Sequence, residues 1–362
     1  MAEVCDAACV STFTRETAHS FTCDLSLDAR RGKHGGQGAP GVRPVRPDEY
    51  QSTSTRMWME QMAFFSIIIT SHNQADFIRN AVASAIAQGH SNREIIVVDD
   101  ASSDGSQRIL EEYGDAIRLT KLDQNVGASR ARNVGTAMAR GDFLVFLDGD
   151  DLLLPWALTV YNEVAEREQP HIILSTMRWF EGQIPNIGGD RAPDNIEVVA
   201  YDSLLEKDRP YRASASALVI SRDAFNAVRG WTNEIFPMED LDALIKLLSS
   251  GRTAQVLAPA TVCYRMHAAN TIHQVANCAG ALRWIIEKEK RRGYPGGQSN
   301  RGRRYAFLGG PALFWLKRAY KAGLYWEALR LLALAWPMIL AAGLRRASVS
   351  LRGRRAVQTF AL

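Results

Sequence analysis

Residues 143–155 (FLVFLDGDDLLLP) constrain the fold of this chain more than any other stretch. The apolar residues before the first aspartate show no solvent-facing alternation, which predicts a strand buried on both faces, as in parallel sheets. Side chains two apart on an extended chain point the same way, so we expect Asp148 and Asp150 to share a face while Asp151 points elsewhere. Carboxylate oxygens suit Mg²⁺ or Mn²⁺, and a phosphate-bearing ligand normally completes the coordination shell. A polar Asp-Gly turn that ends the strand, without any metal, explains residues 148–151 equally well.

Strands and helices alternate before this stretch. Runs of apolar residues predict strands, and between these runs the apolar residues recur every three or four positions, which predicts helices. The predicted strands are 64–70, 93–100, 117–122 and 143–147, and the predicted helices are 76–88, 106–114 and 129–141. This order predicts an α/β fold, a Rossmann-like, mostly parallel sheet with helices on both faces and ligands bound beyond the strand C-termini.

The rest of the chain divides by composition. Residues 1–61 are rich in Gly, Pro, Ser, Thr and Arg, and we expect a disordered extension. We expect residues 62–155 to form a nucleotide-binding half and residues 156–275 an acceptor half, the latter containing a poorly patterned, irregular stretch at 178–212. Residues 276–362 are predicted to form a basic, helical C-terminal region, with a linker at 283–305.

The C-terminal region differs from the rest in charge. Residues 276–362 carry 17 Lys and Arg but only 3 Asp and Glu, although the whole chain has a net charge of +4. Such a tail is typical of contact with an anionic surface. Residues 331–344 are apolar, short for a membrane span of about 20 residues, and flanked by arginines and tryptophans. One hypothesis is that this region docks on the inner face of the membrane; a helical pair packed on the catalytic domain is the other. We expect no nucleic acid partner.

The five cysteines are too few and too scattered to form a disulfide framework. The first residues lack the basic start and apolar run of a secretory signal. We therefore expect a cytoplasmic protein, peripheral on the membrane if the docking hypothesis holds.

Four further groups of residues are candidates for chemistry, each with a structural alternative. Asp99 and Asp100 end a strand, where a carboxylate can accept hydrogen bonds from a base or ribose, or belong to a helix-capping turn. Arg132 lies near a helix start that can steer a diphosphate, or is simply structural. Glu239-Asp240 begins a helix, where Asp240 is either a general base or an N-cap. His267 is either a metal ligand or an ordinary polar residue.

The order of these motifs carries a family resemblance. The succession IIITSHNQ, IIVVDDASSDGS, NVGASRARNVG, FLVFLDGDDLLLP, MEDLDALIKLLSSG and YRMHAANT resembles the family 2 glycosyltransferases with the GT-A fold. The resemblance runs from about Phe64 to His273. It departs from the usual pattern in the first loop, where TSHN stands for PTYN, and in the last, where HAANT lacks the common serine.

The resemblance implies a nucleotide-sugar donor, usually a UDP-sugar, bound with Mn²⁺ or Mg²⁺, and inversion at the anomeric carbon. It implies that Asp240 is the catalytic base, with Glu239 beside it contacting acceptor or donor. The other implied roles are base and sugar binding by Thr70, His72, Asn73, Asp99, Asp100, Arg132 and Asp148, and metal or diphosphate binding by Asp148, Asp150 and His267.

The sequence therefore predicts a metal-dependent inverting glycosyltransferase that acts on a glycan or lipid-linked acceptor in cell-surface assembly. Asp100, Asp150 and Asp240 should then meet at one rim. The alternatives are a nucleotidyltransferase, although the Gly-rich, Lys-bearing phosphate loop it would more often need is absent, and a catalytically inactive nucleotide-sugar-binding module of the same fold.

Overall fold

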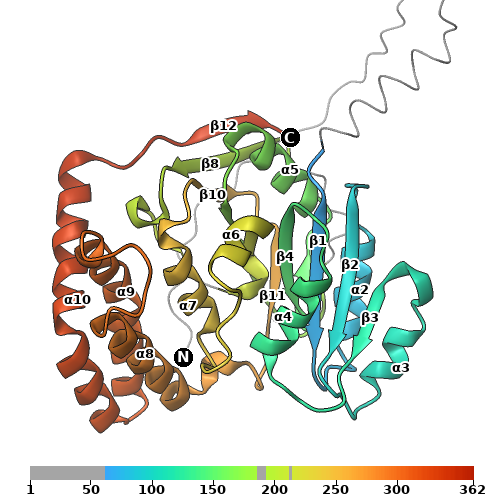
Figure 1. Cartoon of the computed structure of the whole chain (residues 1–362), viewed down its shortest axis with the longest axis horizontal. Helices are drawn as coiled ribbons and strands as arrows, with labels where there is room; N and C mark the ends of the chain where they lie inside the picture. The colour runs from blue at the N-terminus through green and yellow to red at the C-terminus, as the bar shows by residue number, and fades with distance from the viewer. Residues whose placement is uncertain (1–61, 186–192, 212–213) are drawn as a thin grey trace, which may run out of the picture. The chain divides into compact units, whose positions relative to one another are not determined.

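The computed structural model describes residues 62–185, 193–211 and 214–362 (Figure 1). The disorder predicted for residues 1–61 lies outside these residues. Within them a nine-stranded sheet is the centre of the fold. In sheet order its strands are β12 (Gln358–Ala361), β8 (Asn195–Tyr201), β10 (Thr253–Ala258), β6 (Ile172–Leu174), β9 (Leu218–Ser221), β4 (Phe143–Asp148), β1 (Phe65–Ser71), β2 (Arg93–Asp99) and β3 (Arg118–Lys121).

The sheet is mostly parallel, as predicted. β1 pairs in parallel with β2 and β4, and β2 with β3. Only β8 and β9 run against the other strands, because each pairs antiparallel with both of its neighbours. A smaller sheet, β5 (Leu152–Leu153), β11 (Val262–Met266) and β7 (Met177–Glu181), follows the acidic end of β4.

Helices cover both faces of the large sheet. The alternation along β1 explains why, since Ile67 and Ile69 belong to one apolar core and Ile68 to the other. The helices are α2 (Ile78–Ile86), α3 (Ser106–Glu111), α4 (Ala128–Met138), α5 (Ala157–Glu168), α6 (Arg222–Ala227), α7 (Glu239–Lys246), α8 (Val275–Lys290), α9 (Arg301–Lys321) and α10 (Tyr325–Arg352). Residues of α2 and α5 lie in the first core, and those of α4, α6 and α7 in the second.

Several predicted boundaries in the second half are wrong. The stretch 178–212 is not irregular throughout, since β7 and β8 occupy part of it. The predicted linker at 283–305 is also too long, because α8 continues to Lys290 and α9 begins at Arg301. The C-terminal region is not wholly helical, since β12 joins the edge of the large sheet.

The predicted helical hairpin is formed by α9 and α10, which pack closely against each other (Figure 1). Buried residues of both helices, among them Leu308, Trp315 and Met338, share the core that contains α7. This finding agrees with the hypothesis that the pair packs on the catalytic domain. α10 is also long and apolar enough to cross a membrane by length and composition, although only 22% of its most apolar window is buried. The expectation that the apolar segment is too short was based on 14 residues, whereas the helix has 28.

Substitution of Gly309 by alanine is expected to lower the free energy of unfolding by about 1–3 kcal/mol. A Cβ at this position of α9 would lie 2.0 Å from the carbonyl oxygen of Met338 in α10, so the helices would have to separate. Urea unfolding measures the effect. Gly302→Ala on the same helix is the control, because its Cβ would meet nothing within 4 Å, and it should be neutral or stabilising. Equal behaviour of the two variants would contradict this account of the helix contact.

Candidate active site

The acidic end of β4 brings three carboxylates together. Asp148, Asp150 and Asp151 each place an oxygen within 4.8 Å of the others. The prediction that Asp151 points elsewhere is therefore wrong. It assumed an extended chain, but β4 ends at Asp148 and the Asp151 amide donates to the Asp148 carbonyl at 3.0 Å, which closes a turn. Gly149 is required in this turn, since a Cβ there would lie 2.3 Å from Gln74 Oε1 and 3.1 Å from the Thr70 carbonyl oxygen.

Asp151 is the most buried of the three carboxylates. Ser216 Oγ donates to it at 2.6 Å and the Arg265 amide at 3.0 Å, so both of its oxygens have protein partners. Burial, with the nearby Asp150 charge, raises the pKa of Asp151 well above its usual value. These contacts fix the turn to the small sheet, a positioning role that the sequence did not reveal because Ser216 and Arg265 are distant along the chain.

His267 lies beside Asp150, as predicted for two residues of one site. Its Nε2 is 2.9 Å from Asp150 Oδ2, and its ring stacks on Phe77 with centroids 5.1 Å apart. Burial and the Asp148 charge raise the pKa of Asp150, while His267 opposes that shift. The metal or diphosphate role of His267 stays a prediction.

Arg132 connects the two acidic motifs. One guanidinium nitrogen donates to Asp148 at 2.6 Å and another to Glu239 at 2.8 Å, and the group lies 5.1 Å from the centroid of the Trp231 ring. The side chain is buried, as is that of Glu239. Arg132 thus holds the end of β4 against the start of α7. Its predicted contact with the donor would have to form beside these two ion pairs.

Asp240 lies in the first turn of α7 and is not the N-cap, a position that Met238 occupies. Its Oδ1 accepts from the Leu241 amide at 2.6 Å. Burial and the neighbouring Glu239 charge raise the pKa of Asp240 to about 7. A carboxyl group with this pKa can accept a proton near neutral pH, which is the property a general base needs.

The predicted base-binding residues meet at the ends of β1 and β2. His72 Nδ1 lies 2.6 Å from the Asp100 carbonyl oxygen, and Asn73 Oδ1 accepts from the Ser103 amide at 2.8 Å. Thr70, at the end of β1, is paired in register with Asp148 of β4. The carboxylate of Asp100 accepts from two backbone amides, those of Val126 and Gly127.

Asp99 is fully buried and holds the turn after β2. Its Oδ1 accepts from the Ser102 amide at 2.9 Å and from Gln107 Nε2 at 2.7 Å. The structural alternative raised for this pair of acids is met only in part, because Asp99 holds the turn but the N-cap of α3 is Gly105, which has no side chain to cap the helix. A nucleotide contact by either acid stays a prediction.

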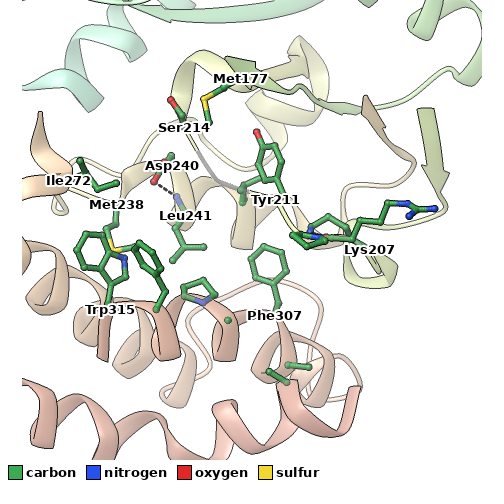
Figure 2. Close-up of a pocket in the computed structure, with 18 of the residues that line it drawn as sticks. Met177, Lys207, Tyr211, Ser214, Met238, Asp240, Leu241, Ile272, Phe307 and Trp315 are labelled. Atoms are coloured by element: carbon green, nitrogen blue, oxygen red, sulfur yellow. Dashed lines mark hydrogen bonds between the residues drawn. The ribbon is translucent and has the colours of Figure 1, made fainter. Parts of the chain in front are cut away.

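A cavity of about 940 Å³ opens beside these groups (Figure 2). Arg132, Asp148, Glu239 and Asp240 line it, whereas Asp100 and Asp150 are not among its lining residues. The single rim expected for Asp100, Asp150 and Asp240 is therefore met only in part. Tyr211 also lines the cavity, and burial together with the Asp240 charge raises its pKa. No motif singles out Tyr211 in the sequence, because this residue stands in the poorly patterned stretch 178–212.

The acidic cluster fits a divalent cation. Burial, together with repulsion among carboxylates whose oxygens lie within 4.8 Å of one another, raises the pKa values of Asp150 and Asp151. A hard cation with oxygen ligands would relieve this repulsion. Asp148 and Asp150 are the candidate ligands, because both oxygens of Asp151 already accept hydrogen bonds from the protein.

The fold and the paired acids at the end of β4 are those expected of a GT-A glycosyltransferase. Residues 66–219 match the sequence model of the family described as glycosyl transferase family 2. This part of the chain is a family 2 glycosyltransferase domain, as its motifs predicted.

Two curated relatives illustrate the similarity. TuaG of Bacillus subtilis, named for teichuronic acid biosynthesis, is 27% identical over 227 residues, which cover 62% of this chain and 87% of TuaG. WfaP of Escherichia coli is 29% identical over 214 residues, covering 55% of this chain and 79% of WfaP. Its name describes a UDP-Glc:α-D-GlcNAc-diphosphoundecaprenol β-1,3-glucosyltransferase.

Solved structures agree on the fold. TarS 1–349 of S. aureus with UDP-GlcNAc superposes with a TM-score of 0.53 at 17% identity, covering 81% of this chain and 93% of that one. In the larger TarS structure, with a TM-score of 0.53 at 20% identity, the match covers 68% of this chain but only 43% of TarS. The predicted fold class is confirmed.

Proposed function

We propose that this protein is a metal-dependent inverting glycosyltransferase that moves a sugar from a nucleotide-sugar, a UDP-sugar in our proposal, to a hydroxyl group in cell-surface polysaccharide or glycolipid assembly. The observation that carries the proposal is the Asp148–Arg132–Glu239 chain of ion pairs, which sets the acidic end of β4 beside Asp240 at one cavity. The names of TuaG and WfaP, and UDP and UDP-GlcNAc in structures of TarS, support the substrate class.

The division of labour follows from the site. Asp148 and Asp150 would hold Mn²⁺ or Mg²⁺, which as a Lewis acid supplies charge stabilisation for a leaving diphosphate. Thr70, His72, Asn73, Asp99 and Asp100 would surround the base and ribose. Asp240 would take the proton of the acceptor hydroxyl, so that the attack comes from the side opposite the leaving group and inverts the anomeric carbon. This single displacement needs no covalent intermediate.

Donor hydrolysis tests the proposal directly. Wild-type protein with Mn²⁺ should release UDP from at least one member of a UDP-sugar panel, and Asp150→Ala should lose that activity because one candidate metal ligand is removed. Glu234→Gln, which changes an exposed acid just before α7, is the matched control and should keep full activity. Release of UDP by the Asp150 variant at the wild-type rate would contradict the metal role. A protein that binds UDP but hydrolyses no donor would be the inactive binding module. Release of sugar 1-phosphate and UMP instead of UDP, from cleavage between the two phosphates of the donor, would indicate a nucleotidyltransferase.

The same proposal places the enzyme on an anionic membrane surface through α10. Several large apolar residues on this helix are more than half exposed, and four of them follow helical spacing: Leu329, Trp336, Leu340 and Leu344. Exposed arginines, among them Arg346 and Arg352, follow them. A stripe of this kind with adjacent basic residues is typical of a helix lying in a membrane interface.

The triple variant Trp336→Ser/Leu340→Ser/Leu344→Ser is expected to lose binding to vesicles that contain phosphatidylglycerol, because exposed apolar area drives the insertion of the helix. Vesicle cosedimentation measures the loss. Ile184→Ser, which removes an exposed apolar residue elsewhere, should bind as the wild type does. A wild-type protein that stays in the supernatant at low salt would overturn the membrane proposal, as would unchanged vesicle binding by the triple variant.

A further inference from the structure

The cavity beside Asp240 continues well past the catalytic carboxylates. Its volume of about 940 Å³ is at the upper end of the range for small-molecule sites. One wall belongs to α9, where Phe307, Pro311 and Trp315 line it opposite Leu241 of α7 (Figure 2). A hydroxylated sugar does not need such an apolar wall, whereas a hydrocarbon chain gains free energy from contact with it.

Basic side chains also line this cavity. They come from the loop after the short 3₁₀ helix Leu204–Glu206, from the C-terminal part of α10 and from the residues just after it, and they are Lys207, Arg209, Arg345, Arg346 and Arg354. Two acids lie near them. Asp208 accepts from Tyr201 Oη at 2.8 Å and from the Arg355 amide at 2.7 Å, and Glu206 pairs with Arg355. Positive charge therefore exceeds negative charge here, the reverse of the acidic end of β4.

Lys207 and Arg345 are close enough to interact, yet in the part of the chain that the structure describes neither forms an ion pair with a carboxylate. Arg345 instead donates to the carbonyl oxygen of Lys207 at 2.9 Å, and Lys207 donates to that of Arg209. Burial and the Arg345 charge lower the pKa of Lys207 to about 8. Two like charges held together in a cavity attract an anion.

We propose that the cavity binds the acceptor as a lipid-linked sugar phosphate. The phosphate lies on Lys207, Arg345 and Arg346, and the hydrocarbon chain lies along the apolar wall of α9. This inference rests on the proposed function, because Asp240 marks the place of the acceptor hydroxyl. A lipid phosphate uses both the cations and the apolar wall, whereas a free sugar or a free phosphate uses at most one of them.

Farnesyl diphosphate is a suitable soluble probe, and calorimetry with the full-length protein measures its affinity. It should bind at least about tenfold more tightly than either inorganic diphosphate or farnesol, since each of these lacks one half of the interaction. The double variant Lys207→Gln/Arg346→Gln should lose at least about tenfold in affinity for the probe. Arg352→Gln, an exposed arginine of the same helix outside the cavity, should bind as the wild type does.

A second variant tests the apolar half without removing any charge. Gly310 of α9 lines the cavity, and a Cβ there would meet nothing within 4 Å, so Gly310→Leu fills the cavity with little strain. It should abolish farnesyl diphosphate binding and leave UDP affinity unchanged. Gly302→Leu, equally free of neighbours but outside the cavity, should change neither.

Two results would overturn this inference: inorganic diphosphate binding as tightly as the lipid probe, or wild-type affinity for the probe in the Gly310 variant. The proposed function fails separately. Absence of donor hydrolysis in the wild-type protein would contradict the enzymatic proposal even where the lipid probe binds as expected.

Discussion

Asparagine at position 240 is expected to lower kcat by about 10²- to 10⁴-fold, the usual contribution of a general base. The amide has nearly the same shape as the carboxyl group but cannot accept the proton of the acceptor hydroxyl. UDP affinity should stay within about twofold of wild type, since Asp240 is assigned to the acceptor side of the site. Initial rates of sugar transfer and calorimetry with UDP separate the two effects. A variant that transfers sugar at the wild-type rate would remove Asp240 from the mechanism.

The raised pKa of Asp240 adds a pH dependence with a definite sign. A carboxyl group with a pKa of about 7 is mostly protonated at pH 6 and mostly ionised at pH 8. Only the ionised form can accept a proton, so kcat/KM for the acceptor should rise across this interval and level off above it. UDP affinity measured at the same pH values is the control. A profile that is flat between pH 6 and pH 8 would contradict the assignment.

The substitution Arg132→Met is expected to lower the free energy of unfolding more than any other substitution proposed for this protein. It would leave the carboxylates of Asp148 and Glu239 without their common cation, and the loss of one partner of a buried ion pair costs about 3–5 kcal/mol. Urea unfolding should show this decrease, together with loss of sugar transfer. Arg130→Met, two positions earlier on the same helix and exposed, should change neither quantity.

The same experiment examines the role that the sequence suggested for Arg132. Glu239→Gln combined with Arg132→Met should recover part of the lost stability, because one of the uncompensated charges is removed. If the Arg132 variant instead kept wild-type stability and lost only UDP affinity, then contact with the donor diphosphate would be its main role.

Three strands of the first half, β1, β2 and β4, could be predicted because they are short apolar runs that are mostly buried, with turn residues after them. β7 and β12 were missed because most of their residues are exposed and they lack such runs. β8 was missed because polar residues interrupt its apolar ones, although four of its seven residues are buried. The pairing of these three strands depends on neighbours far away in the sequence.

The site divides in a similar way. Asp148, Asp150 and Asp240 could be singled out because a strand end or a helix start places them. The pairing of Arg132 with both acidic motifs could not be predicted. The position of an arginine on a helix does not determine which carboxylate, distant in the sequence, will pair with it. The cations of the cavity were also missed, because Lys207 and Arg345 are 138 residues apart and come together only in the folded chain.

The short strand β12 changes the status of the helix before it. α10 is joined to α9 through the turn at Gly323, and β12 pairs with β8 at the edge of the large sheet. α10 is thus held at both ends, by α9 and by the edge of the sheet. An acceptor that enters the cavity meets in α10 a wall attached to the catalytic sheet, and not a free terminal arm.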